Sequence, residues 1–251
     1  MSEFEKFSSP NGVYSDTEIT AALESGHIVC DPPPAKINGS SIDVTLGHYF
    51  YHAGNGRESG IFNPFDKDDV DRYFGDYMEA KPWSDVRKKI ADKAVRDIEY
   101  LEGIPEDHPV IMLRPNERIL AHTNEFIGIK PPGTSSMQAR STTGRMGISA
   151  CYCAGWGDPG YINRWTMEVH NLNEKEHVPL PVGFRLAQIV FSSTGPVGTE
   201  YAKATGNYQA STSAGLESIK ANWHPSQMLP RAYTNEISIP KKPDGLPEGL
   251  K

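Results

Sequence analysis

The stretch AGWGDPGYINRWTMEVHN, residues 154–171, decides which fold the chain is expected to adopt. It opens with a turn-forming Gly-Asp-Pro-Gly run and continues into alternating residues. In a strand, alternation puts Trp165, Met167 and Val169 on one face and the polar side chains on the other. The polar set comprises Thr166, Glu168 and His170. The stretch therefore predicts a turn followed by a strand with one apolar face.

The chain from residue 109 onward contains further short apolar stretches, separated by turns rich in Pro, Gly, Asn and Asp. Strands are expected within residues 109–129, 147–155, 163–173 and 177–194. Because no helical pattern intervenes, we expect a mainly β sandwich or barrel. The 20 prolines and 23 glycines also favour many short strands and turns.

The N-terminal part is expected to begin with a helix. In YSDTEITAALESGHIV, residues 14–29, Ser15 followed by Glu18 forms a capping-box pattern, and Gly26 marks the stop. A strand is then expected where apolar residues alternate with polar ones. The alternating residues are Ile42, Asp43, Val44, Thr45 and Leu46.

Residues 55–108 differ from the rest, because they are dense in charged and aromatic residues. Ser84 is expected to cap a helix that runs to about Leu101. We interpret this segment as a helical insertion on the surface of a single β domain spanning residues 1–251. From about residue 205 the pattern weakens, and a flexible C-terminal lid or tail is expected.

The composition argues against several classes of protein. A net charge of -7 and a pI of about 5.6 disfavour nucleic acid as the main partner. No apolar run approaches the roughly 20 residues of a membrane span, and the opening MSEFEKFSSP does not have the character of a signal peptide. The three cysteines form an odd, sparse set, which favours reduced thiols and a cytoplasmic protein.

A first candidate for chemistry lies in QARSTTGRMGI, residues 138–148, which carries Arg140, Ser141 and Arg145. A guanidinium beside a hydroxyl and turn amides can grip a phosphate. The alternative is a structural turn whose arginine pairs with a surface acid. The chain contains neither a Walker A motif nor a GxGxxG loop.

Asp158 and Glu168 are further candidates. Asp158 either closes an Asx-type turn or binds a ligand, and Tyr161 could offer a ring face to a sugar. Glu168 is a usable general base if its face of the strand points into a closed cavity. The alternative is a glutamate on an edge strand that faces water.

No zinc centre is expected. Cys151 and Cys153 would share one face of the strand predicted within 147–155, but no further ligands follow with zinc spacing. The HxE and PCxxC signature of zinc-dependent deaminases is missing. The eight histidines do not cluster, and none pairs visibly with a Ser or Cys nucleophile.

Four segments in the correct order resemble the dCTP deaminase family, within the dUTPase-like superfamily. Residues 139–148, ARSTTGRMGI, resemble its A/G-R-S-S-x-x-R-x-G segment, and residues 154–169 resemble its A-x-x-x-D-P-G-x-x-G-x-x-x-x-E segment. INGSSIDVTLG at 37–47 and FRLAQIVF at 184–191 resemble the family's N-terminal stretch and its R-x-A-Q strand. The resemblance covers most of residues 13–210, apart from the insertion.

Two residues favour a deaminase over a plain dUTPase. dUTPases lack a second arginine matching Arg145 and a glutamate matching Glu168. The resemblance implies hydrolytic deamination of dCTP to dUTP and ammonia. It also implies a distorted β-barrel or jelly roll, assembled as a homotrimer with sites between subunits. The alternatives are a pure dUTPase, a deaminase of a modified deoxycytidine nucleotide, and a non-catalytic nucleotide-sensing module.

The resemblance also implies a role for each matching residue. Glu168 would activate water for attack on C4 of cytosine, while Ser141 and Arg145 position the water and the developing tetrahedral centre. Asp158 would bind the 3′-hydroxyl, and Tyr161 would pack on the deoxyribose. The triphosphate, carrying Mg²⁺ on its oxygens, would be held by Arg140, Gln188 and a C-terminal segment with Tyr208 and Gln209.

The residues before Asp158 bear on a second activity. Ala154 and Trp156 belong to an Ala-Gly-aromatic run, which resembles family members that also hydrolyse dUTP to dUMP and pyrophosphate. In such members Asp158 also activates water for attack on the α-phosphate. Gly157 replaces the usual aliphatic residue, and we expect it to loosen the loop.

Further departures from the family pattern affect the expected substrate. Asn163 and Arg164 replace the usual x-Gly pair, and Asn207 stands where the family's C-terminal segment carries a lysine. These changes leave room for a 5-substituted deoxycytidine nucleotide or a monophosphate.

Overall fold

The computed structural model describes residues 12–54, 60–91, 102–152, 154–198 and 215–238. Its helices are α1 (Asp16–Glu24), α2 (Lys67–Phe74), α3 (Trp83–Ala91), α4 (Ser141–Arg145), α5 (Gly215–Asn222), η4 (Pro225–Met228) and η5 (Ala232–Thr234). Its first strands are β1 (Ile28–Asp31), β2 (Lys36–Asn38), β3 (Ser41–His52), β4 (Met78–Glu79), β5 (Lys81–Pro82) and β6 (Pro109–Leu113). The remaining strands are β7 (Arg118–Ile129), β8 (Gly133–Ala139), β9 (Ile148–Ser149), β10 (Trp156–Gly157), β11 (Ile162–Asn171), β12 (Val178–Pro181) and β13 (Arg185–Ser193).

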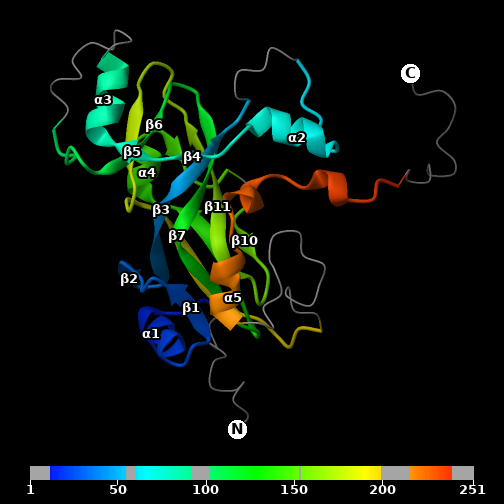
Figure 1. Ribbon diagram of the computed structural model, residues 1–251. Coiled ribbons are helices and arrows are strands. Elements are labelled where there is room, and N and C mark those ends of the chain that lie inside the picture. Colours follow the sequence, from blue (N-terminus) through cyan, green and yellow to red (C-terminus); the bar gives the residue numbers. More distant parts are fainter. Residues whose placement is uncertain (1–11, 55–59, 92–101, 153, 199–214, 239–251) are drawn as a thin grey trace, which may run out of the picture.

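The described strands form two antiparallel sheets. The larger one follows the order β10-β8-β13-β3-β7-β11-β9, with β1 added to β7 and with β2 and β4 added to β3. The smaller sheet has the order β12-β6-β5. Figure 1 shows the long strands β3, β7 and β11 side by side at the centre, with α1 at one end and α2 and α3 at the other. This arrangement confirms the predicted mainly β fold with an N-terminal helix.

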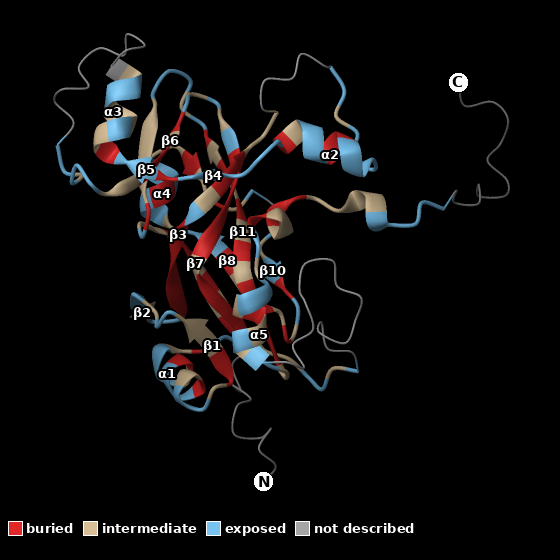
Figure 2. Ribbon diagram, in the orientation of Figure 1, coloured by how far each residue is buried: buried red, intermediate tan, exposed pale blue. Residues whose placement is uncertain are grey.

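The core lies between the strands of the large, curled sheet, whose central strands are buried along most of their length (Figure 2). Consecutive residues of β3 and of β7 are buried, so both faces of these two strands are covered. Ile42, Leu46, Ile119 and Ile127 are fully buried there. Fully burying one such side chain stabilises the fold by about 1.5–3 kcal/mol.

The N-terminal helix forms where the capping box predicted it. Ser15 caps α1, its hydroxyl accepts from the Glu18 amide, and the Glu18 carboxylate accepts from the Ser15 amide at 2.8 Å. The helix ends at Glu24, and Gly26 follows with a φ of 71°. Ile19 and Ala22 anchor one face of α1 in the core.

Three strand predictions need correction. Asp43 and Thr45, expected on a polar face, are buried because both bind partners inside the sheet. The segment 147–155 contains only the two-residue strand β9, and β10 begins after its end. Cys151 therefore lies after β9 and not on a strand. Cys153 lies outside the described residues. Strand β8, which no pattern predicted, pairs with β13 along its whole length.

The segment 55–108 contains two described helices. The helix expected to begin after a Ser84 cap begins at Trp83 as α3, so Ser84 lies inside the helix and the predicted cap is wrong. Residues 92–101 lie outside the described part. Helix α2 is capped by Asp66, whose carboxylate accepts from two amides of the first turn. Its Val70 and Phe74 are buried, so the segment adds to the core as well as to the surface.

The register between the three central strands β3, β7 and β11 is irregular at one level of the sheet. From Arg164 to Thr166, β11 advances two residues while its partner β7 passes from Phe126 to His122, which is four residues. Strand β3 also carries extra residues there, because Leu46 pairs with Thr123 but Phe50 pairs with Ala121. Such bulges bend a strand and redirect its side chains.

His122 and Gly47 fit together at these bulges. A Cβ atom at Gly47 would lie 2.1 Å from the imidazole of His122, so only glycine leaves space for the ring. The His122 Nδ1–H donates to the Thr123 carbonyl at 2.8 Å, and Nε2 accepts from the Tyr49 amide at 3.2 Å. Burial lowers the pKa of His122 from 6.5 to about 3, so the ring is neutral.

We expect the His122 imidazole to make the fold sensitive to acid. Its folded-state pKa lies below the unfolded value, so its contribution is complete above about pH 6.5 and is lost as the pH falls toward 3. Between pH 7 and pH 5, this group should remove about 2 kcal/mol from the free energy of unfolding. Urea denaturation at both pH values should show a smaller loss in His122→Gln. Equal losses in the two proteins would contradict the assignment.

Candidate functional site

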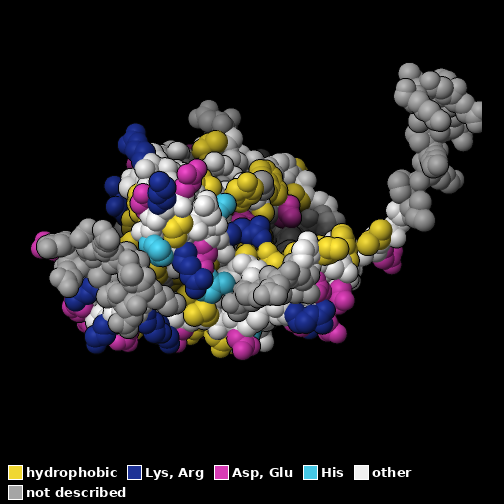
Figure 3. All heavy atoms as spheres, turned by 90° about the horizontal axis from the view of Figure 1, so that it is seen from above, with side chains coloured by type: hydrophobic (Ala, Val, Ile, Leu, Met, Phe, Trp, Pro, Cys, Tyr) yellow, Lys and Arg dark blue, Asp and Glu magenta, His cyan; other side chains and the backbone are white. Residues whose placement is uncertain are grey.

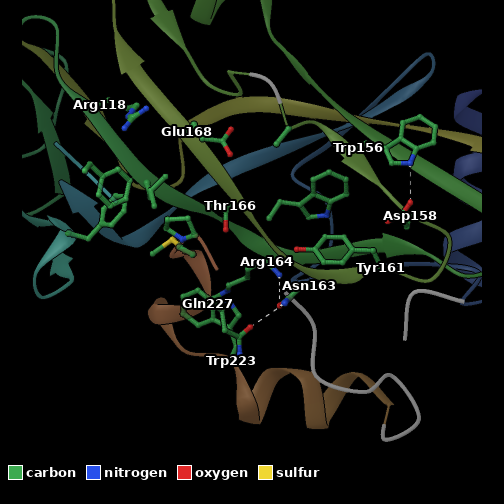
Figure 4. Close-up of a pocket in the computed structure, with 17 residues that line it drawn as sticks. Arg118, Trp156, Asp158, Tyr161, Asn163, Arg164, Thr166, Glu168, Trp223 and Gln227 are labelled. Atoms are coloured by element: carbon green, nitrogen blue, oxygen red, sulfur yellow. Dashed lines mark hydrogen bonds between the residues drawn. The ribbon is translucent and has the colours of Figure 1, made fainter. Parts of the chain in front are cut away.

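A pocket of about 540 Å³ runs along the outer face of β11 (Figure 4). Five of the residues to which the sequence assigned a role in the site line it: Ala154, Trp156, Asp158, Tyr161 and Glu168. Figure 4 shows Glu168 and Thr166 in the middle, with Trp156, Asp158 and Tyr161 on one side and Arg118 on the other. The turn and the strand of residues 154–171 therefore bring the predicted groups together in one cavity.

Glu168 lies on the face of β11 that alternation predicted. Its neighbours Trp165, Met167 and Val169 point into the core with exposures of 3%, 0% and 0%. One carboxylate oxygen of Glu168, Oε2, is buried and has no hydrogen-bond partner among the described residues. A buried carboxylate oxygen without a donor is costly in free energy, and the Glu168 residue itself lines the pocket.

The turn before β11 presents Asp158 at the open side of the pocket. The Tyr161 amide donates to the Asp158 carbonyl at 2.9 Å and closes the turn. The exposed Asp158 carboxylate accepts from the Trp156 indole at 3.2 Å, which fixes its direction. The Tyr161 ring packs edge-on against Trp165, with ring centres 5.3 Å apart, and leaves its other surface to the pocket.

Gly157 tightens this turn, contrary to the expectation that it loosens the loop. It pairs with Ser135 in the sheet and is buried. A Cβ atom there would lie 2.5 Å from the Ser135 hydroxyl and 2.5 Å from the Trp165 ring. The missing side chain therefore makes room for Trp165 beneath the turn.

Residues 215–235, here called the C-terminal strap, form one wall of the pocket. Trp223 lies over the Arg164 guanidinium, with 4.7 Å from the Arg164 Cζ to its ring centre, and Phe126 lies 4.8 Å from the same atom. Gln227 accepts a hydrogen bond from the Asn163 amide at 3.3 Å. Burial lowers the pKa of Arg164, yet a guanidinium stays charged, so its cation–π contact with Trp223 stabilises the docked strap.

The strap is packed against the sheet, which the sequence pattern did not indicate. Ile219 of α5 is 5% exposed and packs with Phe126 and Ile162. Lys220 pairs with Asp31 of β1 at 2.7 Å. The rest of the tail predicted from about residue 205, including Tyr208 and Gln209, lies outside the described residues.

Arg140, Ser141, Arg145 and Gln188 lie apart from the pocket within this chain. Ser141 and Arg145 are exposed residues of α4, and Arg140 precedes them at the end of β8. Gln188 of β13 pairs with Gln138 of β8 and accepts from the Ser41 hydroxyl at 3.0 Å. The four residues lie directly after β8 or on β13, on the neighbouring part of the sheet, and are called here the second polar group.

The fully buried Asp43 orients this second group. Its carboxylate pairs with Arg140 Nε at 3.3 Å and with Arg185 Nη1 at 2.9 Å. It also accepts from the Asn38 amide at 2.8 Å, and Arg140 Nη1 donates to the Arg185 carbonyl at 2.9 Å. Arg140 therefore pairs with a buried acid, and the surface acid considered as the structural alternative is wrong.

The sequence interpretation did not identify several of the residues that line the pocket. They come from the insertion, from β7 and from the C-terminal strap: Phe62, Phe74, Arg118, Leu120, Trp223, Gln227, Met228 and Pro230. These positions are distant in sequence from β11, and no spacing rule connects them to Glu168. Arg164 and Asn163 were visible only as departures from the family pattern.

In the described ranges, no three His, Cys, Asp or Glu side chains gather in a way that could hold a metal ion. No helix within those ranges is long and apolar enough to cross a membrane. On the face seen in Figure 3, acidic side chains lie among the basic ones, so that face presents no continuous basic stripe for a nucleic acid.

We expect Asp43→Asn to destabilise the protein by about 2 kcal/mol, because two guanidinium groups lose their shared buried carboxylate. Urea denaturation measures the change, and Asp76→Asn at an exposed position is the matched control. If Asp43→Asn unfolds at the same urea concentration as the control, the carboxylate does not stabilise this group.

We expect Trp223→Ala to release the C-terminal strap, because it removes the ring that covers Arg164. Trypsin should then cleave after Lys220 at least roughly tenfold faster, since local opening exposes that bond. Trp156→Ala on the opposite wall serves as the control, and its cleavage rate should match that of the unchanged protein. Unchanged cleavage in Trp223→Ala would show that the strap is held elsewhere.

Known proteins resemble this chain in sequence over most of its length. The model of the dCTP deaminase-like family matches residues 13–194. The dUMP-forming dCTP deaminase of Methanopyrus kandleri is 32% identical over 207 residues, covering 78% of this chain and 90% of that protein. The protein of the same name from Dictyoglomus thermophilum is 29% identical over 199 residues, covering 78% and 88%. The dCTP deaminase of Haloarcula marismortui is 28% identical over 183 residues, covering 72% and 80%.

Among solved structures, the 2′-deoxycytidine 5′-triphosphate deaminase from Agrobacterium tumefaciens superimposes with a TM-score of 0.48 at 16% identity. That match covers 72% of this chain and 48% of the other. Since the family model matches well over half of the sequence, the chain belongs to the dCTP deaminase-like family.

Proposed function

We propose that the protein deaminates dCTP to dUTP and ammonia and then hydrolyses dUTP to dUMP and pyrophosphate. The observation that carries the first step is that Glu168, whose Oε2 has no hydrogen-bond partner among the described residues, lines the pocket. Family membership and relatives named dCTP deaminase support the same reaction.

In this proposal, Glu168 acts as general base at the centre of the pocket. The carboxylate takes a proton from water, and the water oxygen bonds to C4 of the cytosine ring. The proton then passes to N3. A second proton moves from the new C4 hydroxyl through the carboxylate to N4, and the C4–N4 bond breaks, so that ammonia leaves and C4 becomes a carbonyl. Tyr161 packs on the deoxyribose, and the Asp158 carboxylate accepts from the 3′-hydroxyl.

The second polar group, with Ser141 and Arg145, completes the site from a neighbouring subunit. Within one chain these side chains do not line the pocket around Glu168. A homotrimer with sites between subunits would bring the hydroxyl and the guanidinium to the developing tetrahedral centre. Arg140, oriented by Asp43, and Gln188 would then meet the triphosphate together with Tyr208 and Gln209.

The second activity rests on Asp158. Its hydrogen bond from Trp156 aims the carboxylate, and an aspartate so held can orient water toward the α-phosphate. The relatives named dUMP-forming support this step. Mg²⁺ would bind to the phosphate oxygens and screen their charge, which needs no protein ligand beyond those oxygens. The reduced thiol of Cys30 is compatible with a cytoplasmic protein.

The test combines purified protein, dCTP and magnesium, with ion-exchange chromatography of the nucleotides and an ammonia assay. We expect ammonia together with dUMP and pyrophosphate. Ammonia with accumulating dUTP would restrict Asp158 to sugar binding. If no ammonia forms but dUTP is hydrolysed, the protein is a dUTPase, and tight binding without turnover would favour a nucleotide sensor.

Two variants separate the roles within this experiment. Glu168→Gln should lower ammonia release by at least about 10³-fold, because the general base is lost. Asp158→Asn should lower the formation of dUMP from dUTP more than it lowers deamination. Glu174→Gln, at an exposed position after β11, is the control and should retain both activities.

A further inference from the structure

The pocket extends past Glu168 along β7 and β11. The register of the two strands places Leu120 opposite Glu168. Farther along the same pair of strands, Arg118 lies opposite His170. Leu120 and Arg118 both line the pocket, whereas Ile119 between them packs in the main core, as alternation along a strand requires. The wall of this extension is therefore apolar next to Glu168 and carries a guanidinium at its far end.

The extension points away from the sugar side of the site. Figure 4 shows Arg118 on one side of Glu168, with Asp158 and Tyr161 on the other. In a deoxycytidine nucleotide the sugar is bonded to N1, C4 is the ring atom opposite N1, and N4 continues the same line outward. With the sugar at Tyr161 and C4 at Glu168, N4 therefore points into the extension. Turning the ring about this line exchanges N3 and C5 but leaves N4 in place.

The apolar part of the extension is closely packed. Leu120, Phe74 and Met228 are 8%, 3% and 4% exposed, and they belong to one hydrophobic cluster. Packed side chains have little freedom to move, so this part admits a short, narrow group and disfavours a bulky one. Met228 lies beyond residue 194, where the family match ends, so the family pattern alone does not describe this wall.

The guanidinium at the far end is available to a ligand. Arg118 is exposed, and its side chain has no hydrogen bond or ion pair among the described residues. The acid next to it in sequence, Glu117, is engaged elsewhere. Its carboxylate lies 2.8 Å from His52 Nδ1 and accepts from the Arg114 amide at 2.7 Å. A guanidinium that lines a pocket without a paired acid is suited to bind the carboxylate of a ligand.

We propose, on the basis of the proposed function, that the extension binds a short substituent on N4 that ends in a carboxylate, and that the protein removes N4 together with this substituent. The oxygen of water bonds to C4, and the two protons of the water pass through Glu168 to N3 and to N4. The C4–N4 bond then breaks, N4 leaves as a primary amine that carries the substituent, and C4 becomes a carbonyl. An N4-carboxymethyl group would leave as glycine, where unsubstituted dCTP releases ammonia.

The test uses the full-length protein with dCTP, N4-carboxymethyl-dCTP and N4-carbamoylmethyl-dCTP. It measures kcat/KM from the total of dUTP and dUMP, separated by ion-exchange chromatography. The carbamoylmethyl group has nearly the shape of the carboxymethyl group but no negative charge. We expect N4-carboxymethyl-dCTP to release glycine with a kcat/KM about tenfold above that of the carbamoylmethyl substrate, the effect of one hydrogen bond to a charged group.

The outcomes separate this inference from the proposed function. Deamination of dCTP without turnover of N4-carboxymethyl-dCTP would overturn the inference and leave the proposed function standing. Equal kcat/KM for the two substituted nucleotides would do the same. Glycine release without ammonia from dCTP would support the inference and overturn dCTP as the substrate. No deoxyuridine nucleotide from any of the three substrates would overturn both.

A pair of arginine variants tests which side chain is responsible. Arg118→Gln removes the guanidinium from the pocket, and kcat/KM for the carboxymethyl substrate should fall to within about twofold of the carbamoylmethyl value. Arg114→Gln removes an exposed arginine that lies before β7 and does not line the pocket, and the preference should persist. Equal loss of preference in both variants would contradict the assignment to Arg118. If either variant fails to fold, the substrate comparison on the unchanged protein still decides.

Discussion

Two hydrogen bonds between Thr45 and the buried Glu125 hold the irregular part of the sheet in place. The Thr45 hydroxyl donates to one carboxylate oxygen at 2.6 Å, and its amide donates to the other at 2.9 Å. Burial raises the pKa of Glu125, while the bonds from Thr45 act in the opposite direction. Because Glu125 lies in the bulge of β7, these bonds keep β3 and β7 paired across residues that leave the regular register.

The position of the pocket depends on this bulge. On one side of it Arg164 faces Phe126 and supports the C-terminal strap, and on the other side Thr166 and Glu168 face the cavity. The Trp165 amide, opposite the bulge, donates to the Thr123 hydroxyl at 2.9 Å. A change of register in β11 would turn Glu168 into the core, because side chains alternate along a strand. The bulge therefore fixes which side chains meet in the pocket.

The sequence predicted well those features that depend on neighbouring residues. The capping box of Ser15 and Glu18, and the alternation around Glu168, follow from local hydrogen bonding and from the geometry of a strand, and both appear in the structure. The burial of Asp43 was not predictable in this way. Its partners Arg140 and Arg185 lie far along the chain, so the alternating pattern placed its polar side chain on the wrong kind of surface.

By itself, the sequence determined the mainly β class, the turn before Asp158 and the strand that presents Glu168, because each depends on residues within one short segment. The family pattern added the correspondence of Arg140, Ser141 and Arg145 with nucleotide chemistry. Only the tertiary structure decided that Arg140 is held by a buried aspartate and that the C-terminal strap covers Arg164. It alone also decided that Phe74, Leu120 and Met228 meet beside Glu168. Those contacts join segments far apart in the chain, and they form only when packing of the central strands brings the segments together.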